Sequence, residues 1–371
     1  MSNQTYTQIA PAIEAALNQD LKPLVTAIDQ EGFYPKDFIH QLGKLGGYAS
    51  VVTPEFGGLG LSLAEQIQAT SQVAETCGST GFVVWCQAVS AWYLHNTNNA
   101  HLKTHFLPAV AKGERLCGTA MSNTVKHLAG IERINLKAEL TENGNYQLSG
   151  TLPWVSNLQE NQWVIAAAEV STGGYIMFLA EINAPEVRLN ACPNFAGMQG
   201  TATYSLRFSQ AEIPANQLLA EPANFAAFIE RIKPGFILSQ LGMGLGIINA
   251  SLASIAASNK THSHVNQFLP VQLDELAKDT AALTQQGLQL AKEATQGKVD
   301  LLAVLKLRAK AAELCLAVTQ AEALHTGARG YLMNHGAQRR QREAMFVAIV
   351  TPALKHLYKE IAGLHSLAKA S

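Results

Sequence analysis

Apolar residues recur at helical spacing through the first third of the chain. Ile9 and Ile13 are four positions apart, and Phe38 and Leu42 repeat that spacing, which puts each pair on one face of a helix. The pattern predicts two helices over residues 6–48.

A serine marks the start of the next predicted helix. Ser62 directly precedes the apolar run at 63–77, and a serine side chain at this place can accept a hydrogen bond from the free N–H groups of the first turn. Residues 79–113 continue with helical spacing around an Asn-rich turn at 96–99. We therefore expect an N-terminal helical domain at 1–113.

The spacing changes to a period of two over residues 114–222. Apolar and polar positions alternate at 134–140, 175–180 and 204–208, each bounded by Gly, Pro or Asn. The run Asn-Gly-Asn at 143–145 is a hairpin signal. This region is predicted to be a small barrel-like or sandwich domain of antiparallel strands.

Helical spacing returns at 223–371, without strand signals. Four segments are long enough for a four-helix bundle: 235–258, 270–295, 300–326 and 341–368. Asp300 is a candidate N-cap and Gly327 a candidate stop. The predicted fold is α+β, with an N-terminal helical domain, a central antiparallel β-domain and a C-terminal four-helix bundle.

Composition is consistent with a large folded core. Hydrophobic residues make up 48% of the 371 positions and charged residues 15%, so disorder is not expected. The formal net charge of −1 provides no basic field for nucleic acid or an anionic membrane surface.

Cysteine usage and the absence of targeting signals indicate a cytoplasmic protein. The five cysteines are odd in number and lack metal-site spacing, so we expect reduced thiols and no metal. The first residues carry no basic region with an apolar core, and no run is expected to span a membrane.

One stretch carries candidate binding chemistry. Gly150 and Pro153 interrupt the predicted strand and turn Trp154 and Ser156 away from regular pairing. An indole beside a hydroxyl suits a flat heteroaromatic ring, since the indole covers a face and the hydroxyl reaches an edge nitrogen. The alternative is a tryptophan packed in the core of the β-domain.

Three segments resemble those of the acyl-CoA dehydrogenase family. Residues 146–157 resemble the flavin-facing strand with its W-[IV]-[TS]-N pattern, and residues 197–220 resemble the segment that closes the β-domain. The glycine-rich segment 46–62, which contains Pro-Glu-Phe-Gly-Gly-Leu-Gly, resembles the family's P-E-x-x-G-G-x-G signature. The order of helices, strands and helices is also the family's order.

The resemblance implies an FAD-dependent oxidoreductase that removes the α and β hydrogens of an acyl thioester, with acyl-CoA as a possible substrate. Trp154 and Ser156 match the positions that stack on the flavin and bond its N5, and Ser122 matches a threonine at the pyrimidine edge of the ring. Met121 lies in the same segment, which corresponds to a loop lining the ring. These four residues are the predicted flavin contacts.

The adenine end of the cofactor is bound by a neighbouring subunit in this family. Gly327, Arg329 and Gly330 match the family's Q-x-x-G-G-x-G loop without its glutamine, and Lys260 is the nearest cation where the family has an arginine. Arg329 could meet a phosphate or remain solvated. Because FAD is completed across subunits, the resemblance implies a homodimer or homotetramer.

The family's catalytic carboxylate has no counterpart at its usual positions. Nine residues after Arg342 the chain has Thr351, and the alternative position on the preceding bundle helix falls near Phe236. Four other titratable residues are candidate substitutes for this base, but each can also be explained by an ordinary structural role: Glu230, Glu343, His356 and Tyr358. The catalytic base is therefore not identified.

Three functions remain open. The first is dehydrogenation of an acyl thioester. The second is monooxygenation with reduced flavin and O₂ on the same scaffold, where relatives also lack the glutamate. The third is a catalytically degenerate subunit that pairs with an active homologue.

Overall fold

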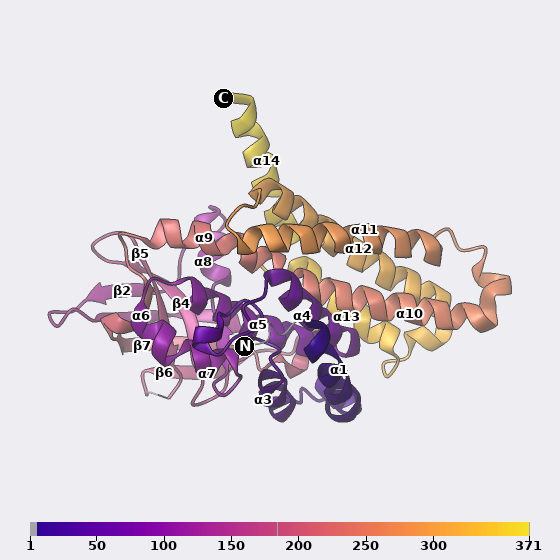
Figure 1. The fold of residues 1–371 in the computed structure, drawn as a ribbon, viewed down its shortest axis with the longest axis horizontal. Helices are drawn as coiled ribbons and strands as arrows, with labels where there is room; N and C mark the ends of the chain where they lie inside the picture. The colour runs from indigo at the N-terminus through magenta and orange to yellow at the C-terminus, as the bar shows by residue number, and fades with distance from the viewer. Residues whose placement is uncertain (1–5, 184, 371) are drawn as a thin grey trace.

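The computed structural model describes residues 6–183 and 185–370, so the first five residues, where a targeting signal was sought, lie outside it. Helices precede and follow a single sheet, with the sheet at one end of an elongated molecule and a helical bundle at the other (Figure 1). This arrangement confirms the predicted fold class. The predicted boundaries at 113 and 222 stay a prediction.

Seven α-helices form the N-terminal part: α1 (Tyr6–Ala16), α2 (Val25–Gln30), α3 (Lys36–Lys44), α4 (Leu63–Thr76), α5 (Gly78–Asn96), α6 (Ala100–His105) and α7 (Leu107–Ala111). Ser62 caps α4 as predicted. Its hydroxyl accepts a hydrogen bond from the Ala64 N–H at 3.1 Å, and its own N–H donates to the Glu65 carboxylate at 2.9 Å.

Helix α5 is buried on all sides from Gly78 to Leu94, which is typical of a helix in the centre of a protein. Gln87 joins this helix to the sheet. Its amide donates to the carbonyl oxygens of Val110 and Arg115 and accepts from the Cys117 N–H.

The sheet contains eight strands: β1 (Cys117–Thr119), β2 (Lys137–Leu140), β3 (Tyr146–Val155), β4 (Trp163–Val170), β5 (Tyr175–Glu181), β6 (Val187–Ala191), β7 (Tyr204–Ile213) and β8 (Leu218–Ala220). Their order is β6-β7-β3-β2-β4-β5-β8, with β1 beside β4. The prediction of antiparallel strands needs a correction, because β4 pairs in parallel with β1 and β2. The β2–β3 hairpin reverses the chain, and β4 then returns on the far side of β2.

The sheet curls around its own apolar core. Phe178 on β5 and Phe208 on β7 meet edge to face with ring centroids 5.9 Å apart, although three strands separate β5 from β7 in the sheet. The sheet is curved as in the barrel-like prediction, but its strand order is open, with β6 and β8 at its two ends.

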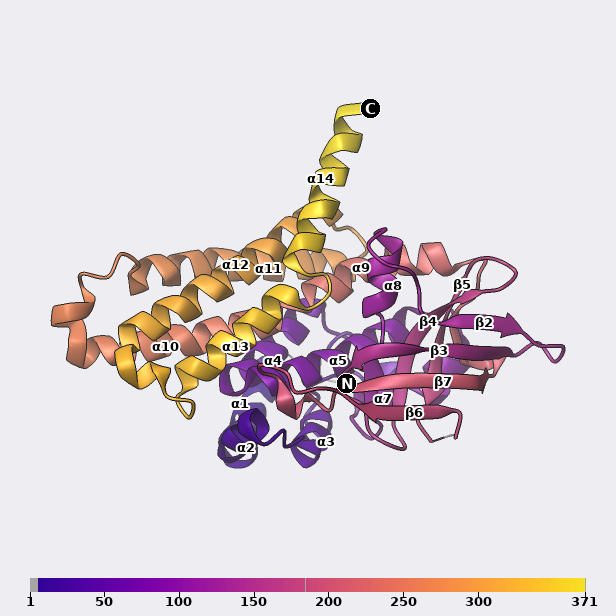
Figure 2. The ribbon, with the colours of Figure 1, turned by 180° about the vertical axis from the view of Figure 1, so that it is seen from behind.

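Six helices complete the chain: α9 (Phe225–Leu238), α10 (Leu241–Asn266), α11 (Leu273–Thr295), α12 (Leu301–Thr326), α13 (Gly336–Ile349) and α14 (Leu354–Ala370). The prediction of a single helix at 341–368 is wrong, because Pro352 lies between the end of α13 and the start of α14. Proline lacks the N–H that a helix interior needs. Helix α14 projects from the body (Figure 2). Asp300 accepts from the Leu302 N–H and caps α12, and Gly327 ends it at φ +61°.

The stretch Phe225–Asn266 is long and apolar enough to cross a membrane by length and composition, which the sequence reading had not expected. In the structure 78% of its apolar window is buried inside the protein. A core helix of a folded protein meets the same criteria, and its burial places this stretch in the core.

Candidate functional site

Strand β3 presents an indole at the surface. Leu152 and Val155 pair with β7, and the two residues between them, Pro153 and Trp154, stand outside the ladder. Trp154 has φ +57°, a conformation that a bulky residue rarely adopts. Its side chain is 63% exposed. The alternative of a packed core tryptophan is therefore excluded.

Gly150 lies before the bulge and pairs with Phe208 on β7. Its φ is +137°, and a Cβ there would lie 2.4 Å from the Asn135 carbonyl oxygen, so only glycine fits. Phe195 meets the Trp154 indole edge to face with centroids 6.0 Å apart. The backbone conformation at the bulge thus leaves the indole of Trp154 exposed.

A chain of hydroxyl groups fixes the direction of the Ser156 hydrogen. Thr201 donates to the Met198 carbonyl oxygen at 2.8 Å, so in its 2.8 Å contact with Thr203 it must accept. Thr203 then accepts from Ser156 at 2.6 Å. The oxygen of the buried Ser156 therefore keeps a lone pair that can accept from a ligand N–H.

The other predicted ring contacts lie at the start of α8 (Ser122–Leu128), where the resemblance implied a loop. The Ser122 hydroxyl is 2.7 Å from the Thr351 hydroxyl. The Thr351 carbonyl oxygen accepts from Gln240, which in turn accepts from the buried Arg308 guanidinium. Thr351, the residue predicted to stand at the family's carboxylate position, thus has a hydroxyl bonded to a predicted flavin contact.

A cavity of about 610 Å³ lies between α5, α8, α9, α12 and α14. Met121 and Phe236 both line it, so the structure brings one predicted cofactor residue and the alternative base position together. Trp154 and Ser156 are not among its lining residues.

Sequence reasoning missed a charged cluster at this cavity. Lys233 on α9 lies 2.5 Å from the Glu360 carboxylate on α14, and the His356 Nε2 lies 2.7 Å from its other oxygen. Burial alone would raise the pKa of Glu360, but hydrogen bonds from His356 and Lys233 lower it below its ordinary value. The detectable signal was the His–Glu pair four positions apart on one helix.

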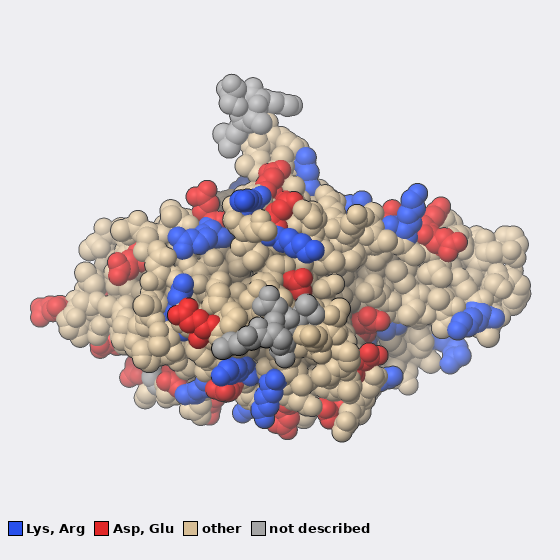
Figure 3. All heavy atoms as spheres, in the orientation of Figure 1, with Lys and Arg blue, Asp and Glu red and all other residues tan. Residues whose placement is uncertain are grey.

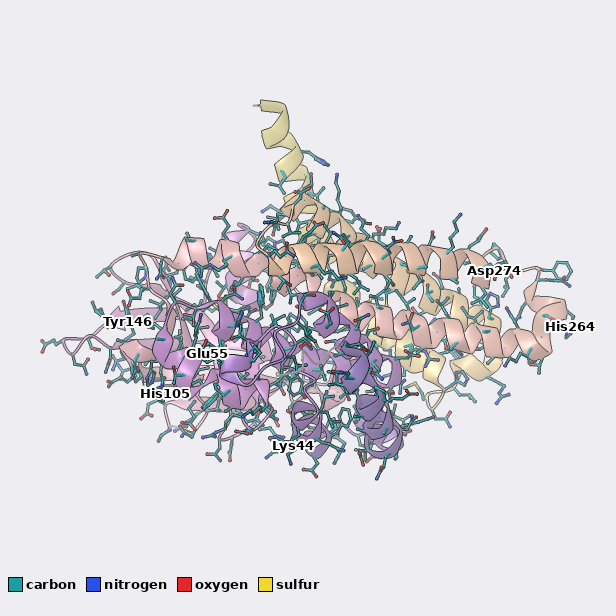
Figure 4. The ribbon with its side chains drawn as sticks, in the orientation of Figure 1. Lys44, Glu55, His105, Tyr146, His264 and Asp274 are labelled. Atoms are coloured by element: carbon teal, nitrogen blue, oxygen red, sulfur yellow. The ribbon has the colours of Figure 1, made fainter. Side chains whose placement is uncertain are left out.

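The predicted adenine contacts lie at the end of the bundle away from the sheet. Figure 4 labels His264 and Asp274 there, and Tyr146 at the opposite end. Arg329 is exposed and forms no ion pair within the described part of the chain. Gly330 is closely packed, since a Cβ would meet the Thr326 hydroxyl. Within one subunit, the predicted adenine contacts therefore lie far from the predicted flavin contact Trp154.

Charge on the surface is mixed. On the face shown in Figure 3, Lys and Arg side chains alternate with Asp and Glu, and neither sign forms a broad patch. Among residues 6–183 and 185–370, no group of three or more His, Cys, Asp or Glu is placed to hold a metal ion.

Comparisons with known proteins agree with this architecture. A family described as acyl-CoA dehydrogenase, N-terminal domain, matches residues 3–114. The human mitochondrial short-chain specific acyl-CoA dehydrogenase is 23% identical over 363 residues, covering 93% of this chain and 86% of that protein.

Solved structures share the whole fold. Butyryl-CoA dehydrogenase from Megasphaera elsdenii superimposes with a TM-score of 0.86 at 19% identity and covers 97% of each chain. Dibenzothiophene monooxygenase TdsC from Paenibacillus sp. A11-2 gives 0.82 at 18% identity and 96% of each chain. The N-terminal part of the chain thus matches the acyl-CoA dehydrogenase N-terminal domain family, and the whole chain has the fold of acyl-CoA dehydrogenases.

Proposed function

We propose that this chain is an FAD-dependent oxidoreductase that acts on an acyl thioester. The observation that carries the proposal is the exposed indole of Trp154, held at positive φ beside Ser156 in a chain with the acyl-CoA dehydrogenase fold. These residues fit a flavin ring, because they offer an aromatic face and a hydrogen-bond acceptor at its edge. When bound, FAD supplies the hydride acceptor.

The residues of the chain bind and orient. Trp154 covers the ring, Ser156 accepts from a ring N–H, and Ser122 with Met121 borders the other side. The apolar cavity beside Met121 has the volume of a small-molecule site and excludes water from the reacting carbon. The proposed substrate is a small molecule, with acyl-CoA as the first candidate.

A homodimer or homotetramer is part of the proposal. Arg329, with Gly327 and Gly330, would face the cofactor of a neighbouring subunit. Large apolar side chains are exposed at that end of the bundle, with Phe268 at 80% and Tyr331 at 84%, and such patches are typical of protein interfaces. We place the protein in the cytoplasm.

Flavin-dependent monooxygenation is the second candidate. Thr351 and Phe236 carry no carboxylate, and the TdsC structure has the same fold. A site that activates O₂ does not need a base for an α-proton. A degenerate subunit is the third candidate, and copurification of an active homologue would support it.

The deciding experiment is an anaerobic titration. The purified protein should be yellow, and an acyl-CoA from a panel of short, medium and aromatic thioesters should bleach it. Colourless protein that takes up no added FAD would overturn the proposal. Yellow protein that no thioester bleaches, and that oxygenates a substrate when supplied with reduced flavin, would favour the monooxygenase.

A further inference from the structure

The cavity between α8, α9 and α14 has one charged place in an apolar wall. Figures 1 and 2 both show these helices meeting where α14 leaves the body. Its lining is largely apolar, with Val125, Leu128, Ile229 and Leu364 among the side chains. Lys233 and Glu360 supply its charges. Removing an ammonium and a carboxylate from water costs free energy, so an ion pair in an apolar wall is a candidate for a functional role.

Both oxygens of Glu360 are already in use. One accepts from the Lys233 ammonium at 2.5 Å, and the other from the His356 Nε2 at 2.7 Å. The ammonium beside this carboxyl group favours its ionised form. His356 is 2% exposed, and it fixes the direction of the carboxylate from behind the cavity wall.

Other titratable groups near the cavity are engaged elsewhere. The Lys359 ammonium donates to the Ala129 and Gly130 carbonyl oxygens. The Tyr93 hydroxyl lies 3.4 Å from the Thr119 hydroxyl, and burial raises the pKa of Tyr93 far above its ordinary value. Glu360 is therefore the one acid among the cavity's lining residues, and Lys233 the one cation.

We propose that Glu360 is the proton acceptor of this cavity, that Lys233 binds the carbonyl oxygen of the substrate, and that His356 positions the carboxylate. The inference rests on the proposed function and gives it the base that Thr351 and Phe236 do not provide. The substrate class is a carbonyl compound with an apolar or aromatic chain and a hydrogen on the carbon next to the carbonyl.

The step balances without an oxidant. The α C–H bond breaks, and its proton goes to a Glu360 oxygen. The electron pair forms a double bond between the α-carbon and the carbonyl carbon, and the C=O π pair moves to oxygen. The ammonium of Lys233 faces the resulting negative charge, and such placement of a cation is the main way a protein stabilises an enolate.

Substrate binding itself makes the carboxylate a better base. When Lys233 turns from Glu360 to the carbonyl oxygen, Glu360 loses one donor while it stays beside apolar side chains. Loss of that partner in a desolvated place raises the pKa of a carboxyl.

Hydrogen exchange tests the step separately from flavin reduction. The purified protein is reduced with dithionite, so that it cannot oxidise a substrate, and is incubated in D₂O with butyryl-, octanoyl- or phenylacetyl-CoA. Mass spectrometry of the recovered thioester measures deuterium at the α-carbon. At least one thioester should gain deuterium, and Glu360→Gln should lower that rate by about 10²-fold or more.

The variants separate the three roles. Lys233→Met should lower exchange as strongly, whereas Glu360→Asp should retain part of it. His356→Gln should lower the exchange rate and move its pH profile, which a purely structural role would not do. Glu169→Gln is the matched control, because Glu169 pairs with Lys137 on the sheet, away from the cavity, and should leave exchange unchanged.

The outcomes distinguish the inference from the proposed function. If Glu360→Gln is folded and exchanges as fast as wild type, or if wild type exchanges none of the three thioesters, the inference is overturned. If exchange depends on Glu360 while the protein binds no FAD, the inference stands and the proposed function fails. If acyl-CoA bleaches wild type and Glu360→Gln equally fast, the proposed function stands and the inference fails.

Discussion

Two carboxylates on successive helices differ in what they face. Glu343 on α13 is 1% exposed, accepts from the Gly78 N–H at 3.0 Å and lies 3.4 Å from Arg339. A Cβ at Gly78 would stand 2.7 Å from its second oxygen, so no ligand can reach it. Glu360 on α14 is also paired, but it lines a cavity.

The difference shows that burial and pairing alone do not identify a functional acid. Glu343 holds α13 against the start of α5. No cavity adjoins its ion pair with Arg339, so no ligand can bind there. Glu360 has the same kind of partner and an open side. The adjoining cavity is the feature that separates a structural carboxylate from a candidate base.

The largest expected effect is on stability at Glu343. Glu343→Gln leaves the Arg339 guanidinium buried without its counter-charge, and breaking such a pair costs about 3–5 kcal/mol. Urea unfolding followed by circular dichroism measures the change. A loss below about 1 kcal/mol would contradict the structural assignment of Glu343 and weaken the comparison with Glu360.

The open indole of β3 should affect cofactor binding rather than folding. Trp154→Ala should lower FAD affinity by roughly tenfold or more, because an aromatic pair contributes about 0.5–1.5 kcal/mol beyond the area it buries. Equilibrium dialysis against FAD measures the affinity. Trp154→Phe is the control and should keep most of the binding.

An Ala variant that stays fully yellow, with unchanged spectrum and affinity, would remove Trp154 from the site. The ring would then have to bind elsewhere, and the cavity beside Met121 would be the next candidate.

Local signals predicted much of the fold. Ser62 and Asp300 cap helices as expected. Pro153 lies in the bulge with Trp154 as predicted, whereas Gly150 does not interrupt the ladder, because it pairs with Phe208. Pro352 indicates a helix break, but the apolar spacing on both sides of it favours one continuous helix at 341–368, so the pattern alone gives the wrong prediction. The parallel pairing of β4 depends on the path of the whole chain, so no local pattern could reveal it.

The cavity cluster could not be predicted for a similar reason. Lys233 and Glu360 are 127 positions apart, and only the packing of α14 against α9 brings them together. The ring contacts Trp154 and Ser156 could be proposed from the sequence because they lie two positions apart, at the end of β3. The assignments of Trp154 and Ser156 remain predictions until a cofactor is measured.

Acid should remove the stability that the Glu360 pair contributes. The pKa of Glu360 is lowered in the folded protein, so the pair contributes stability above the unfolded value of about 4.5 and loses it as the pH falls below that value. Since Lys233 is partly exposed, we expect about 1 kcal/mol. Unfolding of wild type and Glu360→Gln at pH 7 and pH 3.5 tests this, and the two proteins should converge at the lower pH. Equal pH dependence of the two would show that the pair does not form in solution.

The smallest expected effect concerns the hydroxyl chain behind Ser156. With Thr203 present, Ser156 can only accept from the ring edge, which favours the reduced flavin because its N5 carries a hydrogen. Thr203→Val removes the acceptor of the Ser156 hydrogen, so Ser156 can donate to the oxidised ring instead. A neutral hydrogen bond contributes about 1 kcal/mol, which corresponds to roughly 20 mV in a two-electron couple.

Spectroscopic redox titration should give a more negative midpoint potential for Thr203→Val. Ser156→Ala should abolish the effect of the Thr203 substitution, and a shift of equal size in that background would show that it does not pass through Ser156.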